Sequence, residues 1–231
     1  MRRIVLIIFI SAACLFMLNI SVSMNQCVDY KCFQRKIPLY LKILDFFDRH
    51  YNYKRLTREI VGGVKTEEEK VMKIFAWTAQ NIRRVPPGFP VVDDHIWHII
   101  VRGYGADDQS CDVFATLCNY AGSESFYAHL DKSVSGPRIF LAFTRIKDEW
   151  YAFDPYRGIY FVDAGGKLIA LGRLKEGAEY SARPLKEGDT FDYSGYFANL
   201  PGDIIVKLGR SNIQFPLKRL IFEVNKWVRR N

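Results

Sequence analysis

Residues 101–118 combine a glycine-punctuated loop with the start of an amphipathic helix, in the sequence VRGYGADDQSCDVFATLC. Ser110 is a residue type that caps helices, because its hydroxyl can accept a hydrogen bond from an unpaired N–H of the first turn. The apolar side chains that follow have the spacing of one buried helical face: Val113, Phe114, Leu117 and Cys118. We therefore predict a helix that is capped by Ser110 and packed against the rest of the domain.

This prediction puts Cys111 on the first turn of the helix. A thiol at a helix N-terminus feels the positive end of the macrodipole, which favours the thiolate. Neighbouring carboxylates act in the opposite direction, because negative charge raises the pKa of a thiol. Three such residues surround it in sequence: Asp107, Asp108 and Asp112. By its position, Cys111 is a candidate nucleophile.

Residues 109–115, QSCDVFA, resemble the nucleophile segment of the transglutaminase-like group within the papain-like superfamily. Residues 70–83 resemble the leading helix of that group, and residues 150–155, WYAFDP, resemble the strand that ends in its orienting Asp. The three segments occur in the order of the group and lie within residues 66–165. The resemblance implies an α+β fold with a papain/transglutaminase-like core, in which the Cys-bearing helix packs on an antiparallel sheet. Extra N- and C-terminal helices would flank this core.

One position departs from the pattern. The group carries its general-base His near the start of the strand before the Asp strand, where this chain has residues 138–140, Arg-Ile-Phe. If residues 133–136 form a hairpin turn, His129 pairs with about residue 140, where directly opposed Cβ atoms are roughly 5 Å apart. A shift of one residue in register reverses the face. His129 is therefore either a relocated base or an ordinary strand histidine.

The resemblance assigns Cys111 as the nucleophile and Asp154 as the orienting carboxylate, with Gln109 as a candidate oxyanion contact. Thiol acyl transfer needs a thiolate, a base within hydrogen-bond reach and a group that orients the base. The missing His favours an exported, catalytically degenerate domain that serves binding or assembly in the cell envelope, for example in an envelope polysaccharide system. The alternative is a thiol-dependent amide hydrolase or acyl transferase that uses His129. A peptide or an amide-bearing envelope polymer would be its partner.

The N-terminal segment carries Arg2 and Arg3 before an apolar run over residues 4–22. This pattern is typical of a signal peptide, with Ser21-Val22-Ser23 as the cleavage site, or of an N-terminal membrane anchor. With the two arginines held in the cytoplasm, the rest of the chain would face outward. We expect an exported protein that is membrane-anchored, periplasmic or extracellular, and that contacts the membrane through this segment.

The formal net charge is +8, and much of it is terminal. A basic stripe interleaved with aromatic residues is not seen in the middle of the sequence, which argues against a nucleic-acid partner. Residues 93–98, DDHIWH, offer two imidazoles without a clear third ligand, which is weak support for zinc. We predict no metal and no cofactor.

The cysteines near the N-terminus suggest a covalent link. Thiols tend to pair outside the cytoplasm, and Cys27 and Cys32 are close in sequence. A local disulfide is the preferred interpretation, with two free thiols as the alternative. Cys118 is expected to be a small core residue. It would lie roughly 10 Å from Cys111 along one helix, beyond the reach of a disulfide.

The remaining pattern predicts the other elements. A capping box at residues 66–69, TEEE, begins a helix that ends before Pro86. Further helices are expected at 38–50 and 53–61; strands are expected at 126–130, 138–146 and 150–153, followed by a hairpin of 158–161 with 167–171. The sequence does not place residues 178–209.

A last helix is expected to begin at Pro216, with an apolar stripe on one side and basic residues on the other. It would either dock on the domain or lie on a lipid surface. The chain then divides into a signal or anchor (1–23), a helical extension (24–65), the transglutaminase-like core (66–175) and a C-terminal extension (176–231).

Overall fold

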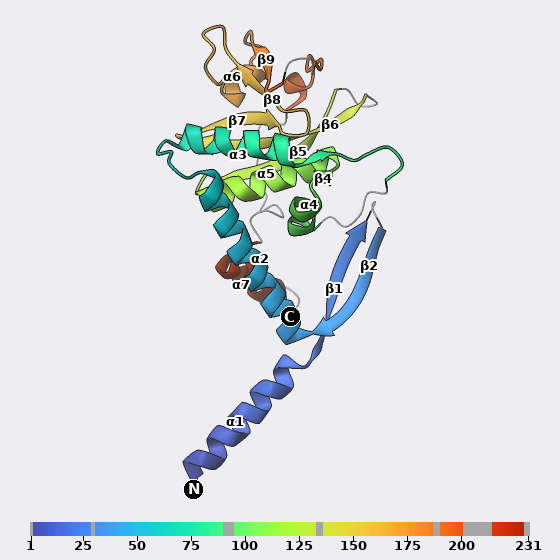
Figure 1. The fold of residues 1–231 in the computed structure, drawn as a ribbon, viewed down its shortest axis with the longest axis vertical. Helices are drawn as coiled ribbons and strands as arrows, with labels where there is room; N and C mark the ends of the chain where they lie inside the picture. Colours follow the sequence, from blue (N-terminus) through green and yellow to red (C-terminus); the bar gives the residue numbers. More distant parts are fainter. Residues whose placement is uncertain are drawn as a thin grey trace.

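A computed structural model of the chain (Figure 1) describes residues 2–28, 31–89, 95–132, 136–186, 190–200 and 214–228. Its centre is a five-stranded antiparallel sheet in the order β5-β6-β7-β8-β9. Helices α2 to α5 lie on one face of this sheet. The short helices α6 (Leu171–Lys175) and η1 (Phe197–Asn199) contribute to a second buried cluster on the other face. The α+β prediction, with an antiparallel sheet, is confirmed.

The Cys-bearing helix α5 (Asp107–Ala121) lies between the sheet and the other helices. It contacts β5 and β6 on one side, and α2 (Leu39–Ile60), α3 (Glu67–Asn81) and α4 (Ile96–Arg102) on the others. Ten consecutive residues of α5, from Gln109 to Cys118, are buried. A helix that is buried all round is held by packing on every side, which fixes the position of Cys111.

Helix α3 begins as the sequence predicts. The Thr66 hydroxyl accepts a hydrogen bond from the Glu69 N–H at 3.2 Å, and a Glu69 carboxylate oxygen accepts one from the Thr66 N–H at 3.1 Å. This reciprocal pair satisfies two backbone donors at the helix start. The prediction of two helices before it is wrong, because α2 runs unbroken from Leu39 to Ile60. The expected break at residues 51–52 contains neither proline nor glycine, so nothing interrupts the backbone.

The first three strands of the sheet agree with the predicted ones to within about a residue or two. They are β5 (Ser125–Asp131), β6 (Arg138–Ile146) and β7 (Glu149–Asp154). The turn between β6 and β7 places Lys147 at φ 49° and Asp148 at φ 72°, the left-handed conformation that tight hairpin turns require at both positions. β8 (Ile159–Val162) pairs with β9 (Ser181–Pro184). The predicted hairpin of 158–161 with 167–171 is reduced to one bridge between Val162 and Leu168.

Side chains alternate between the two faces of the sheet, as a period of two requires. Ala142, Ile146 and Phe153 join a buried cluster with the helices, which we call the helix-side cluster. Leu141 and Ala152 join a second buried cluster with residues 159–200, which we call the far-side cluster. The sheet is therefore covered on both faces. The far face is covered partly by residues 191–200, which belong to the stretch that the sequence did not place.

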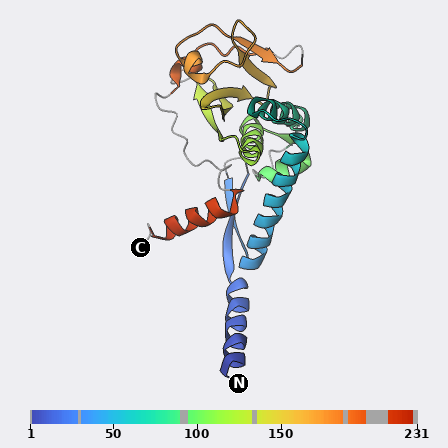
Figure 2. The same ribbon diagram turned by 90° about the vertical axis from the view of Figure 1, so that its left-hand side faces the viewer.

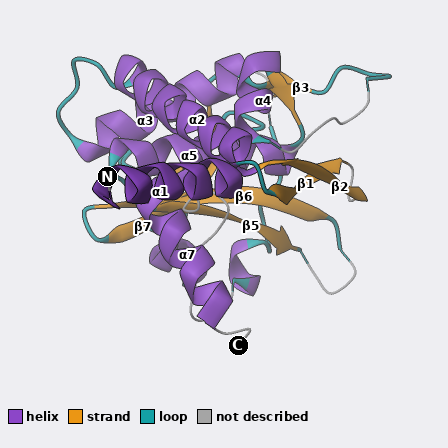
Figure 3. Ribbon diagram, turned by 90° about the horizontal axis from the view of Figure 1, so that it is seen from below, coloured by secondary structure: helices purple, strands orange, loops and turns teal. Residues whose placement is uncertain are grey.

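The N-terminal part projects away from the sheet (Figure 2). It consists of α1 (Arg2–Leu18) and a hairpin of β1 (Ser21–Val28) with β2 (Lys31–Pro38), which Figure 3 shows from below. The sequence did not predict this hairpin. Among the described residues, no helix combines the length and the apolar character needed to cross a membrane. The backbone register puts Cys27 opposite Cys32, but their side chains lie outside the described part, and so does the predicted disulfide.

Candidate functional site

Helix α5 starts one turn earlier than predicted. Its first residue is Asp107, and Ala106 is the residue before it. The hydroxyl of Ser110 donates to the carbonyl oxygen of Ala106 at 3.0 Å, so Ser110 lies within the helix and the prediction that it caps the N-terminus is wrong. Cys111 is the fifth residue of the helix and lies just beyond its first turn. The dipole effect falls off within the first turn, so it supports a thiolate at Cys111 only weakly.

The side chain of Gln109 is buried and links the start of α5 to the end of α4 and to the loop between these helices. Its Oε1 accepts the backbone N–H of Ala106 at 3.1 Å and the Nη2 of Arg102 at 2.8 Å. Gly105 leaves room for this amide, because a Cβ there would lie 3.2 Å from the Oε1 of Gln109. The amide oxygen thus has a structural role in positioning the helix, and the role of Gln109 as an oxyanion contact stays a prediction.

The Cys111 side chain is fully buried in the helix-side cluster. Burial raises the pKa of this thiol well above its ordinary value, and the negative charges of Asp154 and Asp107 raise it further. Both effects disfavour the charged form. No hydrogen bond or ion pair joins Cys111 to a histidine in the part of the chain that the structure describes. The thiol is therefore held neutral near neutral pH.

Asp154 is the last residue of β7 and is fully buried. Its Oδ1 accepts the backbone N–H of Arg157 at 2.9 Å, and its Oδ2 accepts Nη1 of the same arginine at 2.9 Å. The hydroxyl of Tyr193 also donates to Oδ2, at 2.7 Å. A buried carboxylate needs such partners to offset the cost of losing water. In this chain an arginine and a tyrosine supply them.

Arg157 and Tyr193 are the site residues that sequence reasoning missed. Arg157 is three residues after Asp154, and its guanidinium carbon lies 4.2 Å from the centroid of the Phe191 ring, in a cation–π contact. Burial raises the pKa of the Tyr193 hydroxyl, and the Asp154 charge raises it further, so the phenol stays protonated and donates. The proximity of Arg157 to Asp154 in sequence was a usable signal. Tyr193 comes from the unplaced stretch and offered none.

His129 pairs with Phe140 across β5 and β6, and the register predicted from the hairpin is confirmed. Its side chain is 51% exposed, with Nε2 3.8 Å from a carboxylate oxygen of Asp131 and the ring centroid 6.0 Å from that of Phe140. Phe140 occupies the region where the resemblance expects a histidine, and it packs against the helix-side cluster. The role of His129 as a base stays a prediction, and the contacts of its imidazole are with Asp131 and Phe140.

The other histidines lie elsewhere. His50 shares a 2.8 Å hydrogen bond with the Tyr120 hydroxyl, and the rings of His95 and His98 are 4.9 Å apart between centroids. Residues 93 and 94, the Asp pair of the weak zinc pattern, lie outside the described residues. Within those that are described, no cluster of three or more histidine, cysteine or acidic residues could hold a metal ion.

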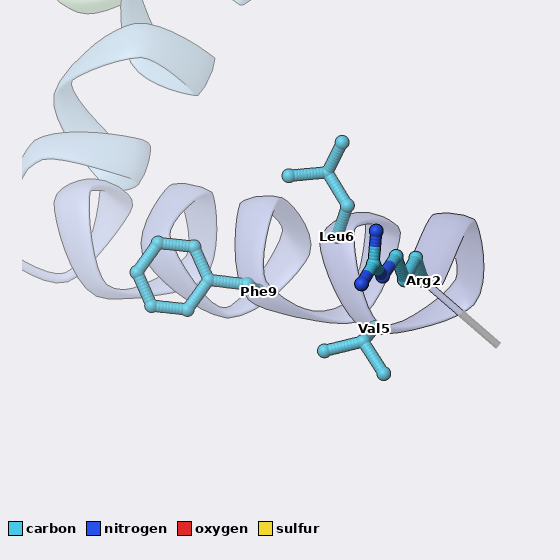
Figure 4. A pocket seen from close by; sticks show the side chains of 4 residues that line it. All are labelled: Arg2, Val5, Leu6 and Phe9. Atoms are coloured by element: carbon cyan, nitrogen blue, oxygen red, sulfur yellow. The ribbon is translucent and has the colours of Figure 1, made fainter.

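A surface hollow is formed by residues 2–9, far in sequence from Cys111 and Asp154. Figure 4 shows it on the exposed helix α1, flanked by Arg2, Val5, Leu6 and Phe9. These side chains come from one helix and leave the hollow open, so it is an exposed apolar surface rather than an enclosed ligand cavity.

No protein-family model and no curated protein matches the chain. Among solved structures, it is similar to a proposed cysteine protease from Cytophaga hutchinsonii, with 18% identity, a TM-score of 0.41 and coverage of 62% of this chain. A proposed protease from Parabacteroides distasonis (12% identity, TM-score 0.38) and a TGase (10%, 0.37) each match 58% of the chain. The matches cover 51%, 35% and 43% of those three structures, respectively. Identities and scores this low do not support an assignment of fold or function.

Proposed function

We propose that this protein contains a transglutaminase-like domain that has lost thiol catalysis and serves as a binding or assembly domain in the cell envelope. The observation that carries the proposal is the bonding of Asp154. Its carboxylate accepts hydrogen bonds from Arg157 and Tyr193, whereas an orienting carboxylate would accept one from an imidazole. The proposal also rests on the resemblance of residues 109–115 and 150–155 to that group.

The order and packing of the elements support the domain type. A leading helix, α3, packs against α5, which carries Cys111 just after its first turn. Helix α5 packs on β5 and β6, and the next strand, β7, ends at Asp154. This is the arrangement that the resemblance implies for a papain/transglutaminase-like core.

The chemistry of the residues around Cys111 supports the loss of catalysis. Acyl transfer needs a group that removes the thiol proton. A guanidinium is protonated at all relevant pH values and accepts no proton, so Arg157 cannot act as the base. Tyr193 is held in its protonated form, in which it donates to Asp154. With the pKa of Cys111 raised by burial and by acidic neighbours, the site favours a neutral thiol.

The envelope setting is inferred from the N-terminal segment. Arg2 and Arg3 precede an apolar run, and α1 leaves large apolar side chains exposed, such as Ile7 at 62% and Phe9 at 72%. Exposed apolar surface of this size needs a covering partner. A membrane, or removal of the segment as a signal peptide, would account for it. In either case the domain would be exported.

The proposal is tested by alkylation of Cys111 with iodoacetamide as a function of pH, followed by peptide mass spectrometry. We expect slow labelling at pH 7 that rises continuously to at least pH 9.5, and no hydrolysis of amide substrates above a Cys111→Ser control. A rate that reaches its plateau below pH 7 would show an activated thiolate and overturn the proposal. The thiol of N-acetylcysteine, alkylated under the same conditions, serves as the reference for reagent reactivity.

The alternative function, an amide hydrolase or acyl transferase with His129 as base, is favoured by one observation. His129 lies directly across from Phe140, near the region that the resemblance expects to carry a histidine. The half-exposed imidazole contacts Asp131, however, while the thiol is fully buried. The two functions differ in a measurable way, because only the alternative requires the reactivity of Cys111 to depend on His129.

A further inference from the structure

Helix α7 (Pro216–Val228) is attached to the domain at its N-terminal end. The ring of Phe215 stacks on Tyr120 with 4.3 Å between centroids, and the Tyr120 hydroxyl donates to the carbonyl oxygen of Gln214 at 3.0 Å. His50 adds an edge contact to Phe215. These contacts, together with a contact between α7 and α2, hold one side of the helix against the domain.

The apolar stripe of α7 is exposed. Its described members are 50% to 69% exposed: Leu217, Leu220, Ile221, Val224 and Val228. They recur at the spacing of a single helical face. The expectation that this stripe docks on the domain is therefore wrong. A continuous apolar helix face in water indicates a surface that another molecule covers.

The charge of this segment identifies the kind of partner. Residues 216–231 contain five Lys and Arg residues and one acidic residue, Glu223, for a net charge of +4, half of the +8 of the whole chain. Exposed Lys218 and half-buried Arg219 lie on the helix outside the apolar stripe, as does Glu223, which pairs with Arg219. An apolar face bordered by basic residues is the pattern of helices that lie in the interface of anionic membranes.

The position of α7 in the molecule points to the same partner. Figures 1 and 2 both show α7 and α1 on the side of the molecule away from the five-stranded sheet. Helix α1 also exposes its apolar side chains along its whole length, from Ile4 at 63% to Leu18 at 37%. One lipid surface could cover both helices, whereas a protein partner would need two separate apolar sites.

We propose that α7 binds an anionic lipid surface through Leu217, Leu220, Ile221, Val224 and Val228, with its basic residues against the headgroups. The helix then acts as a second membrane contact in addition to α1 and holds the sheet domain close to the bilayer. This inference does not depend on whether Cys111 is catalytic.

The test measures the surroundings of single positions in the full chain. Cys14, Cys27 and Cys32 are replaced by Ser, so that the remaining native cysteines are the two buried ones. An environment-sensitive fluorophore is attached to Val224→Cys, on the stripe, or to the matched Asn225→Cys, which is exposed on another face. The proteins are mixed with phosphatidylcholine vesicles that contain nitroxide-labelled lipid, with or without phosphatidylserine.

We expect at least fivefold stronger nitroxide quenching at position 224 than at 225 when phosphatidylserine is present. We also expect several-fold weaker quenching at 224 without it. The charge-reversed chain Arg229→Glu/Arg230→Glu should lose this lipid dependence while the fluorophore stays attached. Equal quenching at both positions, or equal quenching with both lipids, would overturn the proposal. Shielding of position 224 from water without nitroxide quenching would also overturn it, since that result indicates a second copy or another protein.

Discussion

The hydroxyl of Tyr193 donates a 2.7 Å hydrogen bond to Oδ2 of Asp154, across 39 residues of sequence. Tyr193→Phe removes this donor while the two bonds from Arg157 remain. Because hydrogen bonds to buried charged groups are among the stronger ones, we expect the free energy of unfolding to fall by about 2 kcal/mol. Urea denaturation measures the change.

Tyr180→Phe is the matched control for this substitution. Tyr180 packs against Phe161 in the same cluster, and no described hydrogen bond holds its hydroxyl. Its loss should change the unfolding free energy by less than about 0.5 kcal/mol. Equal effects of the two substitutions would mean that the bond to Asp154 adds nothing to stability.

The raised pKa of Cys111 predicts a loss of stability at alkaline pH. Above roughly pH 9 the thiol loses its proton in the unfolded chain but keeps it in the folded one. The unfolding free energy then falls by about 1.4 kcal/mol per pH unit for this group. Cys111→Ser should remove that amount from the slope between roughly pH 9.5 and 10.5, measured by urea denaturation at several pH values.

Cys118→Ala provides a comparison for this slope. Burial also raises the pKa of the Cys118 thiol, so its removal should reduce the alkaline slope by a similar amount. The double substitution should reduce it by about twice as much, since each thiol contributes one proton. An unchanged slope for Cys111→Ser would show that this thiol ionises as readily in the folded chain as in the unfolded one.

His129→Ala should leave the alkylation of Cys111 unchanged at every pH between 6 and roughly 9.5. The reason is the geometry of the imidazole, which is half exposed and lies beside Asp131 rather than against the thiol. Rates for wild type and variant are compared by peptide mass spectrometry. A slower reaction of the variant confined to neutral pH would instead support the relocated base, because only a histidine that withdraws the thiol proton acts in that range.

Gly122 ends α5 at φ 96°, and the N–H of Ser123 donates to the carbonyl oxygen of Cys118 at 3.0 Å. Gly122→Ala should cost about 1–2 kcal/mol of unfolding free energy, because a Cβ strains this left-handed conformation. Gly172→Ala, inside α6 and with open space around its Cβ, should instead be neutral or stabilising by up to about 1 kcal/mol. Thermal or urea denaturation of the two variants measures the change in unfolding free energy. A destabilisation of the same size in both variants would refute the argument from φ.

Sequence reasoning succeeded where a feature is encoded within a few residues. The capping box at Thr66, the turn after β6 and the pairing of His129 with Phe140 all depend on neighbouring residues. The Ser110 cap failed although the competing contacts are also local: Gln109 bonds to Arg102 and Ala106, and the helix starts earlier.

The partners of Asp154 show a limit of sequence reasoning within the candidate site. Arg157 is three residues away and could have been considered, but Tyr193 lies in a stretch without helical or strand periodicity. Its position depends on packing against Phe161 and Phe197, whose rings it meets at 4.8 and 6.5 Å. Such tertiary contacts leave no pattern in a single sequence.

The segments that pack on the two faces of the sheet are synthesised at different times. Helices α2 to α5 precede the strands, so one face can close as soon as β7 leaves the ribosome. The other face waits for residues 191–200, because Tyr193, Tyr196 and Phe197 belong to its buried cluster. A nascent chain that ends before them leaves part of this apolar face uncovered, the kind of surface that chaperones bind. Asp154 needs Tyr193 from this late segment as a hydrogen-bond partner. The candidate site is therefore completed among the last steps of folding during translation.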